Sequence, residues 1–129
     1  MAFILSIHCP LGADTKNMIG AREVALMPRG SFLINTARGA VLDTSCIADA
    51  LARGHLAGAG IDVLATEPPA ADDPLLSAWR DPHHPAHHRL ILNPHSAFYA
   101  EEGLLDMRVK GSQSCRKALL GQRLSNVVN

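Results

Sequence analysis

Four short apolar runs divide the chain, and each ends at a polar or turn-forming residue. They cover residues 3–7, 31–35, 57–64 and 90–92. Each run is continuous and rich in aliphatic side chains, which is typical of strands covered on both faces rather than of strands with one wet face. The pattern therefore predicts four buried strands.

Helical spacing of apolar residues fills the first gap between these runs. Asp14 or Thr15 can cap a short helical segment that extends through Ile19. The sequence AREVALM then predicts a helix, which Pro28 ends. Two short helical segments are expected between the first and second strands.

The later gaps are less uniform. Asp43 or Thr44 is a suitable N-cap for SCIADALARG, and Gly54 marks the end of that helix. Residues 67–89 contain five prolines, so we expect a long loop with at most one helical turn around LLSAW. Residues 100–121 space Leu, Met and Val among charges, which predicts an amphipathic helix of about five to six turns.

Strands that alternate with helices predict an α/β fold with a parallel sheet. The chain has 129 residues and is 47% hydrophobic, which suffices for one packed domain or for part of a larger one. Twelve basic residues balance twelve acidic ones. With no net positive charge, the protein has no overall electrostatic attraction for nucleic acid or an anionic membrane, so we expect neither as a direct partner.

The cysteines favour a reducing compartment. Cys9, Cys46 and Cys115 are odd in number, far apart and free of CxxC spacing, which argues against a disulfide framework and a zinc site. The apolar opening segment has no basic start and ends at Pro10, too early for a signal peptide or a membrane span. We expect a cytoplasmic protein.

Several chemically useful side chains follow the predicted strands. In a parallel sheet the ligand crevice lies beyond the carboxyl ends of the strands. Arg38 offers a planar fork of donors that matches a carboxylate, although a salt bridge that holds a loop is the alternative. Asp62 can accept a hydrogen bond from a ligand amide or cap a helix.

His95 is the natural candidate for a general acid or base at a strand end, because an unperturbed imidazole titrates near neutral pH. A buried structural histidine is the competing interpretation. Glu67 can bond the far nitrogen of that imidazole, which would fix its tautomer and favour its protonated form. Otherwise Glu67 is a solvated loop carboxylate.

The stretch HHPAHH at residues 83–88 invites a metal-site interpretation. Pro85 interrupts any helical face, and no carboxylate lies within the motif. We therefore expect a solvated loop and no metal.

Taken together, LSIHCPLGADTKNMIG, GSFLINTARGAVLD, LAGAGIDVLATEPP and NPHSAFYAEEGLLDMR resemble the D-isomer-specific 2-hydroxyacid dehydrogenase family. The resemblance covers almost the whole chain and is closest to phosphoglycerate-dehydrogenase-like and C-terminal-binding-protein-like members. It implies the second, nicotinamide half of a Rossmann-type parallel sheet with a long C-terminal helix.

The resemblance also implies roles for individual residues. Arg38 matches the arginine that binds the substrate carboxylate, Glu67 its carboxylate partner and His95 the acid/base histidine. The nicotinamide end of bound NAD would be surrounded by Pro10, Thr15, Thr36, Ala37, Arg38, Asp62, His95 and Ala97. The implied reaction is reversible hydride transfer between NADH and a small 2-oxo acid, in a full-length form that is a homodimer.

One part of the family pattern is missing. A strand, a GxGxxG turn and an acidic residue for the adenosine ribose open the family's cofactor domain, and none is found here. Gly54, Gly58 and Gly60 follow a helix and precede a strand, so we interpret them as a helix-to-strand turn. We expect residues 1–129 to be a partial NAD-binding domain, the C-terminal part of a longer dehydrogenase that lacks its substrate domain. Alone, it should be inactive and bind NADH weakly.

Two alternatives to an enzyme stay open. The first is an NAD(H)-sensing corepressor of the C-terminal-binding-protein type, in which the dinucleotide controls oligomer formation and partner recruitment. The second is a non-functional truncated product. A screen of 2-oxo acids with the full-length protein would separate the enzyme from the corepressor.

Overall fold

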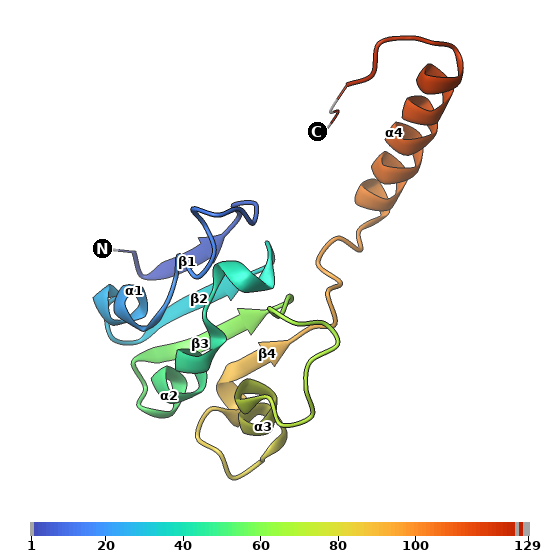
Figure 1. Cartoon of the computed structure of the whole chain (residues 1–129). Coiled ribbons are helices and arrows are strands. Elements are labelled where there is room, and N and C mark those ends of the chain that lie inside the picture. Colours follow the sequence, from blue (N-terminus) through green and yellow to red (C-terminus); the bar gives the residue numbers. More distant parts are fainter. Residues whose placement is uncertain (1, 126, 128–129) are drawn as a thin grey trace. The chain divides into compact units, whose positions relative to one another are not determined.

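The computed structural model describes residues 2–125 and 127 and divides the chain into two units, which meet between Ser96 and Ala97. The first unit contains a four-stranded parallel sheet (Figure 1). Its strands are β1 (Ile4–Ile7), β2 (Ser31–Asn35), β3 (Leu56–Ile61) and β4 (Leu90–Leu92), adjacent in chain order. All four carboxyl ends therefore lie along one edge, here called the carboxyl edge, and all four amino ends along the opposite amino edge.

The sheet is built around its two central strands. Leu33 of β2 pairs with Leu5 of β1 and with Ala59 of β3, and its side chain is fully buried. Leu56 and Ile61 of β3 are also buried. The parallel α/β architecture and the presence of the four predicted strands are thus confirmed. The expectation that these strands are covered on both faces is wrong, since Ile4 of β1 is 60% exposed.

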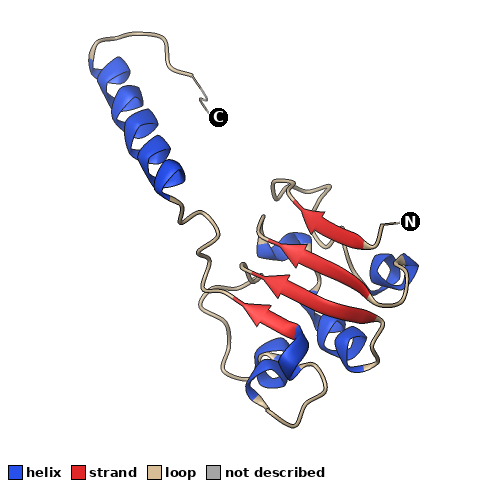
Figure 2. Ribbon diagram, turned by 180° about the vertical axis from the view of Figure 1, so that it is seen from behind, coloured by secondary structure: helices blue, strands red, loops and turns tan. Residues whose placement is uncertain are grey.

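Helices cover one face of this sheet (Figures 1 and 2). They are α1 (Ala21–Leu26), α2 (Ile47–Ala52) and α3 (Pro74–Arg80). Val24 of α1, Ile47 and Leu51 of α2 and Leu75 of α3 belong to the same buried cluster as the strand residues. Burial of these side chains supplies the main free energy of folding for the first unit.

The opposite face of the sheet carries no helix within the described part of the first unit, as Figure 2 shows. Phe32 and Ile91 point out from this face and are 42% and 66% exposed. Gly58 and Gly60 line the same shallow apolar groove. Parallel sheets usually have both faces covered, so this uncovered face is unusual for its class.

Three local predictions were wrong. Residues 14–19 form hydrogen-bonded turns rather than a helix, because Asn17 has a φ of 50° and Ile19 forms an isolated bridge with Leu42. The α3 helix is longer than one turn, because Asp73 accepts hydrogen bonds from the backbone at its start and Pro74 suits the first helical position. Gly58 and Gly60 lie within β3 rather than in a turn.

The second unit contains α4 (Glu101–Leu119), a single helix of 19 residues, in agreement with the amphipathic pattern. Asp106 and Lys110 form an i,i+4 ion pair on its surface. Among the described residues, no helix has the length and apolar character that crossing a bilayer requires.

Candidate functional site

Arg38 lies in a turn that follows β2 and is organised by a buried amide. Asn35, the last residue of β2, has no exposed surface. Its Oδ1 accepts a hydrogen bond from the Ala37 N–H (3.1 Å), and its Nδ2 donates to the Arg38 carbonyl (3.2 Å). Arg38 itself donates from Nη1 to the Ala37 carbonyl (2.7 Å). Asn35 therefore fixes the backbone from which the exposed guanidinium extends.

Gly39 brings this turn against the loop that follows β3. A Cβ atom at Gly39 would lie 1.9 Å from the carbonyl carbon of Leu64 and 2.0 Å from its oxygen. Such distances are impossible for a side-chain carbon, so only glycine permits this approach of two backbones. The contact places the Arg38 turn beside the segment that leads to Glu67.

Glu67 is held by two hydrogen bonds. Its Oε1 accepts from the Leu64 N–H (2.7 Å), and its Oε2 lies 2.7 Å from Nδ1 of His95. The bond to His95, then the bond to Leu64, lowers the pKa of the Glu67 carboxyl, and the nearby positive charge of Arg38 also lowers it. The Glu67 carboxyl is therefore ionised at neutral pH, where it is bonded to the imidazole of His95.

His95 has an unusual backbone conformation, with a φ of 53°. Such angles are uncommon outside glycine and often occur at functional sites. Asp62 holds this conformation: its carbonyl accepts from the His95 N–H (2.9 Å), and its Oδ1 accepts from the Ser96 N–H (2.9 Å). The Asp62 residue is only 4% exposed.

The Glu67 to His95 hydrogen bond also determines the imidazole tautomer. An ionised carboxylate can only accept, so Nδ1 of His95 carries the hydrogen in this pair. Nε2 is then the ring nitrogen that can exchange a proton with a ligand. Glu67 and His95 thus have the arrangement of a general acid/base and its orienting carboxylate.

An apolar cavity of about 450 Å³ adjoins this pair. Its walls include Pro68, Pro69, Leu76, Trp79, Leu92 and Pro94. Apolar walls exclude water and strengthen the electrostatic interactions beside them. The pair therefore has an apolar side formed by α3 and the loops after β3 and β4.

A second cavity of about 330 Å³ lies between the ends of β1 and β2. It is lined by His8, Cys9, Pro10, Thr36, Ala37 and Arg38. Thr15 closes the loop beside it, because its hydroxyl donates to the Pro10 carbonyl (2.7 Å) and accepts from the Gly12 N–H (2.8 Å). Four of the residues predicted near a cofactor are thus gathered here.

The remaining predicted site residues are distributed as follows. Asp62, Glu67 and His95 line the apolar cavity, whereas Ala97 belongs to the second unit. Sequence reasoning missed Asn35 and Gly39. A polar residue that ends an apolar run was a usable signal for Asn35, but nothing local indicated the contact of Gly39 with Leu64.

The described residues contain no group of three or more histidine, cysteine or acidic side chains able to hold a metal. In the histidine-rich stretch, Nδ1 of His84 accepts from the Ala86 N–H, and Nδ1 of His87 bonds the Trp79 carbonyl. These side chains therefore organise the loop after α3.

Comparison with known proteins adds a family to this geometry. Residues 1–97 match the family described as D-isomer specific 2-hydroxyacid dehydrogenase, NAD binding domain. The match includes Arg38, Glu67 and His95.

Individual relatives point the same way. A putative 2-hydroxyacid dehydrogenase of Haemophilus influenzae is 39% identical over 113 residues, which are 88% of this chain and 34% of the relative. D-3-phosphoglycerate dehydrogenase of Escherichia coli K12 is 52% identical over 77 residues, 60% of this chain and 19% of the enzyme. A crystal structure of a D-lactate dehydrogenase from Treponema pallidum superposes with a TM-score of 0.84 at 29% identity, covering 99% of this chain and 40% of that one. The chain thus spans about a third or less of the curated relatives' length.

Proposed function

Because this chain belongs to the D-isomer-specific 2-hydroxyacid dehydrogenase family, we propose that it supplies the catalytic residues for reversible hydride transfer between NAD(H) and a small 2-hydroxy or 2-oxo acid. One observation carries the proposal. The 2.7 Å contact of Glu67 with His95 Nδ1 leaves Nε2 for proton transfer, and the Arg38 cation lies near enough to lower the pKa of Glu67.

Each of these side chains has a task in the reduction of a 2-oxo acid. Arg38 binds the substrate carboxylate through its guanidinium fork and polarises the adjacent carbonyl. His95 donates the proton from Nε2 to the carbonyl oxygen, and Glu67 stabilises the cationic imidazole before that transfer. Bound NADH supplies the hydride. In the reverse direction His95 accepts the proton from the hydroxyl group.

The cavity between β1 and β2 fits the nicotinamide end of NAD. It lies at the carboxyl edge, where dinucleotide sheets bind their ligands, and Pro10, Thr36 and Ala37 would form its contacts with the ring. A glycine-rich cradle for the pyrophosphate is not found in this sequence, since Gly58 and Gly60 belong to β3. Residues 1–129 therefore act as a partial NAD-binding domain, completed by further segments of a longer dehydrogenase.

We assign this dehydrogenase to the cytoplasm and expect it to form a homodimer. The odd number and wide separation of Cys9, Cys46 and Cys115 support a reducing location. Size-exclusion chromatography with light scattering tests the oligomeric state of the completed protein.

A chimaera tests the reaction. The chain replaces the segment that it matches in the Haemophilus influenzae relative, and NADH oxidation is measured with glyoxylate, pyruvate and hydroxypyruvate. We expect turnover of at least one acid. His95→Asn should lower kcat by about 100-fold or more, since general acid/base catalysis contributes that much, and Arg38→Ala should raise KM and lower kcat together.

Two matched variants control for non-specific effects. His83→Asn removes an exposed histidine from the loop after α3, and Arg22→Ala removes an exposed arginine from α1. Both should keep the kinetics of the parent chimaera. Full activity of the His95→Asn variant in a folded, NADH-binding chimaera would refute the role of His95.

A further inference from the structure

Asn35 connects the two parts of the carboxyl edge that the proposed reaction needs. It is the last residue of β2 and is 0% exposed. Its side chain bonds the turn that carries Arg38. Its main-chain carbonyl accepts a hydrogen bond from the Asp62 N–H (3.0 Å). One buried residue thus contacts both the segment of the Arg38 cation and the segment that holds His95.

The Asn35 amide determines the backbone position from which the Arg38 guanidinium extends. Its Oδ1 accepts from the Ala37 N–H, and the Ala37 carbonyl in turn accepts from Nη1 of Arg38 (2.7 Å). Its Nδ2 donates to the Arg38 carbonyl, which also accepts from the Val41 N–H (3.2 Å). Without the amide, the Arg38 carbonyl keeps its bond to Val41, whereas the Ala37 N–H loses the acceptor that Asn35 supplies.

The main chain of Asn35 leads to the proton-transfer pair. The Asp62 N–H bonds the Asn35 carbonyl, and the Asp62 carbonyl accepts from the His95 N–H (2.9 Å). A substitution of the Asn35 side chain leaves both of these backbone bonds in place. The two roles of this residue can therefore be separated, because a change of side chain affects the Arg38 turn and leaves the backbone that carries His95.

We propose that Asn35 is a positioning residue, whose buried amide holds the Arg38 turn at the separation from His95 that the substrate requires. This inference rests on the proposed function, in which Arg38 binds the substrate carboxylate and His95 transfers the proton. A displacement of Arg38 on the order of 1 Å would misplace the substrate carbonyl relative to Nε2 of His95. An amide suits this position, because it supplies both an acceptor and donors but no charge that would compete for the guanidinium.

The first test is kinetic and uses the chimaera with the Haemophilus influenzae relative. Asn35→Ala should lower kcat/KM for the 2-oxo acid by about tenfold or more, since small misplacements of a reacting group have effects of that size. KM should rise and kcat should fall together, as for Arg38→Ala. The pH dependence of kcat should match that of the parent, because the Glu67 to His95 bond is not touched. A shifted pH dependence would contradict an effect through Arg38.

A double-mutant cycle separates positioning from general damage. If Asn35 acts through Arg38, Asn35→Ala should cause no further loss of kcat/KM in a chimaera that already carries Arg38→Ala. A purely structural role would lower kcat/KM by the same factor in both backgrounds. Equal factors would therefore overturn the proposal.

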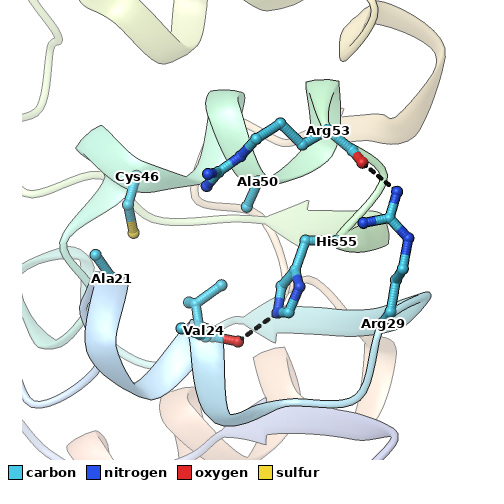
Figure 3. A pocket seen from close by; sticks show the side chains of 8 residues that line it. Ala21, Val24, Arg29, Cys46, Ala50, Arg53 and His55 are labelled. Carbon is cyan, nitrogen blue, oxygen red and sulfur yellow. Dashed lines mark hydrogen bonds between the residues drawn. The ribbon is translucent and has the colours of Figure 1, made fainter.

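Two variants at the amino edge are matched controls. Ser31 begins the same strand and is also 0% exposed, and its Oγ donates to the Pro28 carbonyl. Nη2 of Arg29 donates to the Arg53 carbonyl (2.7 Å), as Figure 3 shows. Ser31→Ala and Arg29→Ala each remove a bond between a side chain and a turn carbonyl without touching the carboxyl edge. Both should keep the kinetics of the parent chimaera.

Amide hydrogen exchange in the 129-residue chain tests the geometry without turnover. Asn35→Ala should speed exchange at the Ala37 N–H, whereas the Asp62 N–H, which bonds a main-chain carbonyl that the variant retains, should stay protected. Unchanged exchange at Ala37 would overturn the proposal. Asn35→Leu has nearly the same volume and no hydrogen-bonding group, so it should show the same changes even where the cavity left by alanine prevents folding.

The outcomes distinguish this inference from the function on which it rests. An inactive parent chimaera would contradict the proposed function and, with it, the role of Asn35. An active parent whose Asn35→Ala and Asn35→Leu variants keep its kcat/KM would contradict only the role of Asn35.

Discussion

The two edges of the sheet carry similar side chains but hold them differently. At the carboxyl edge, His95 has a positive φ, and Gly39 lies against the backbone of Leu64. At the amino edge, Arg29 and Arg53 are exposed and rest on short turns. These turns are joined by the Arg29 to Arg53 bond and by a backbone bond from the Gly30 N–H to the His55 carbonyl. Proton transfer demands a fixed geometry between several groups. The exposed side chains of Arg29 and Arg53 are under no comparable constraint. The difference agrees with the proposal that the carboxyl edge carries the catalytic side chains.

The largest expected effect tests the contact between the two loops at the carboxyl edge. Gly39→Ala forces a Cβ into the Leu64 carbonyl group and should lower the free energy of unfolding by about 3 kcal/mol or more. Its counterpart at the amino edge is Gly54→Ala. Gly54 has a φ of 64°, and the neighbours of an added Cβ are flexible arginine side chains, so the cost should be only about 1 kcal/mol.

Urea unfolding of both glycine variants gives the two free energies. Equal losses of stability would mean that the carboxyl edge is no more constrained than the amino edge. Gly12→Ala is a useful third variant, because the nearest atom to its Cβ, Thr15 Oγ1, lies at an ordinary contact distance of 3.8 Å.

The next effect concerns the carboxylates. Asp62→Ala leaves the Ser96 N–H without its acceptor and should destabilise the first unit by about 2 kcal/mol. Asp49→Ala removes only an exposed ion pair and should change the stability by less than about 0.5 kcal/mol. Thermal unfolding measures both. The backbone amide of His95 should also exchange its hydrogen faster in the Asp62 variant. A His95 amide that stays protected would contradict the positioning role of Asp62.

The smallest effect depends on pH. Because the pKa of Glu67 is below its ordinary value of 4.5, the folded state gains stability that is complete above that value and is lost as the pH falls through the lowered pKa. The side chain is 37% exposed, so the contribution should stay below about 1 kcal/mol. Glu67→Gln should remove this loss of stability at low pH, whereas Asp49→Asn should retain it. The midpoints of urea unfolding between pH 6 and pH 3 measure both.

Much of the fold could be predicted from local sequence. The strands at 31–35 and 90–92 were predicted with their observed bounds, since an apolar run there is enclosed by polar or turn residues. The segment at 14–19 could not be predicted in the same way, because its pairing with Leu42 depends on a contact distant in sequence. In α3, the high proline content of the loop concealed the cap of Asp73 and the favourable position of Pro74.

The difference between local sequence signals and contacts distant in sequence also applies to the site. Strand-end positions made Arg38, Glu67 and His95 candidates, because the topology of a parallel sheet brings such positions to one edge. Their proposed roles came from the family resemblance and not from position alone. The hydrogen bonds of Asn35 and the approach of Gly39 to Leu64 depend on how two loops pack together. They leave no periodic signal, and only the folded chain reveals them.

The contact of Gly39 with Leu64 also bears on how this sequence can diverge. The atoms that meet Gly39 belong to the main chain of Leu64 and Ala65, so their side chains are not what the contact constrains. In a library randomised at positions 39, 64 and 65, selection for folding would retain glycine at 39 and admit many residues at 65. Tolerance to substitution would then differ sharply between two segments in direct contact. Position 39 would accept no side chain, whereas position 65 contributes only its main chain to the contact and could change.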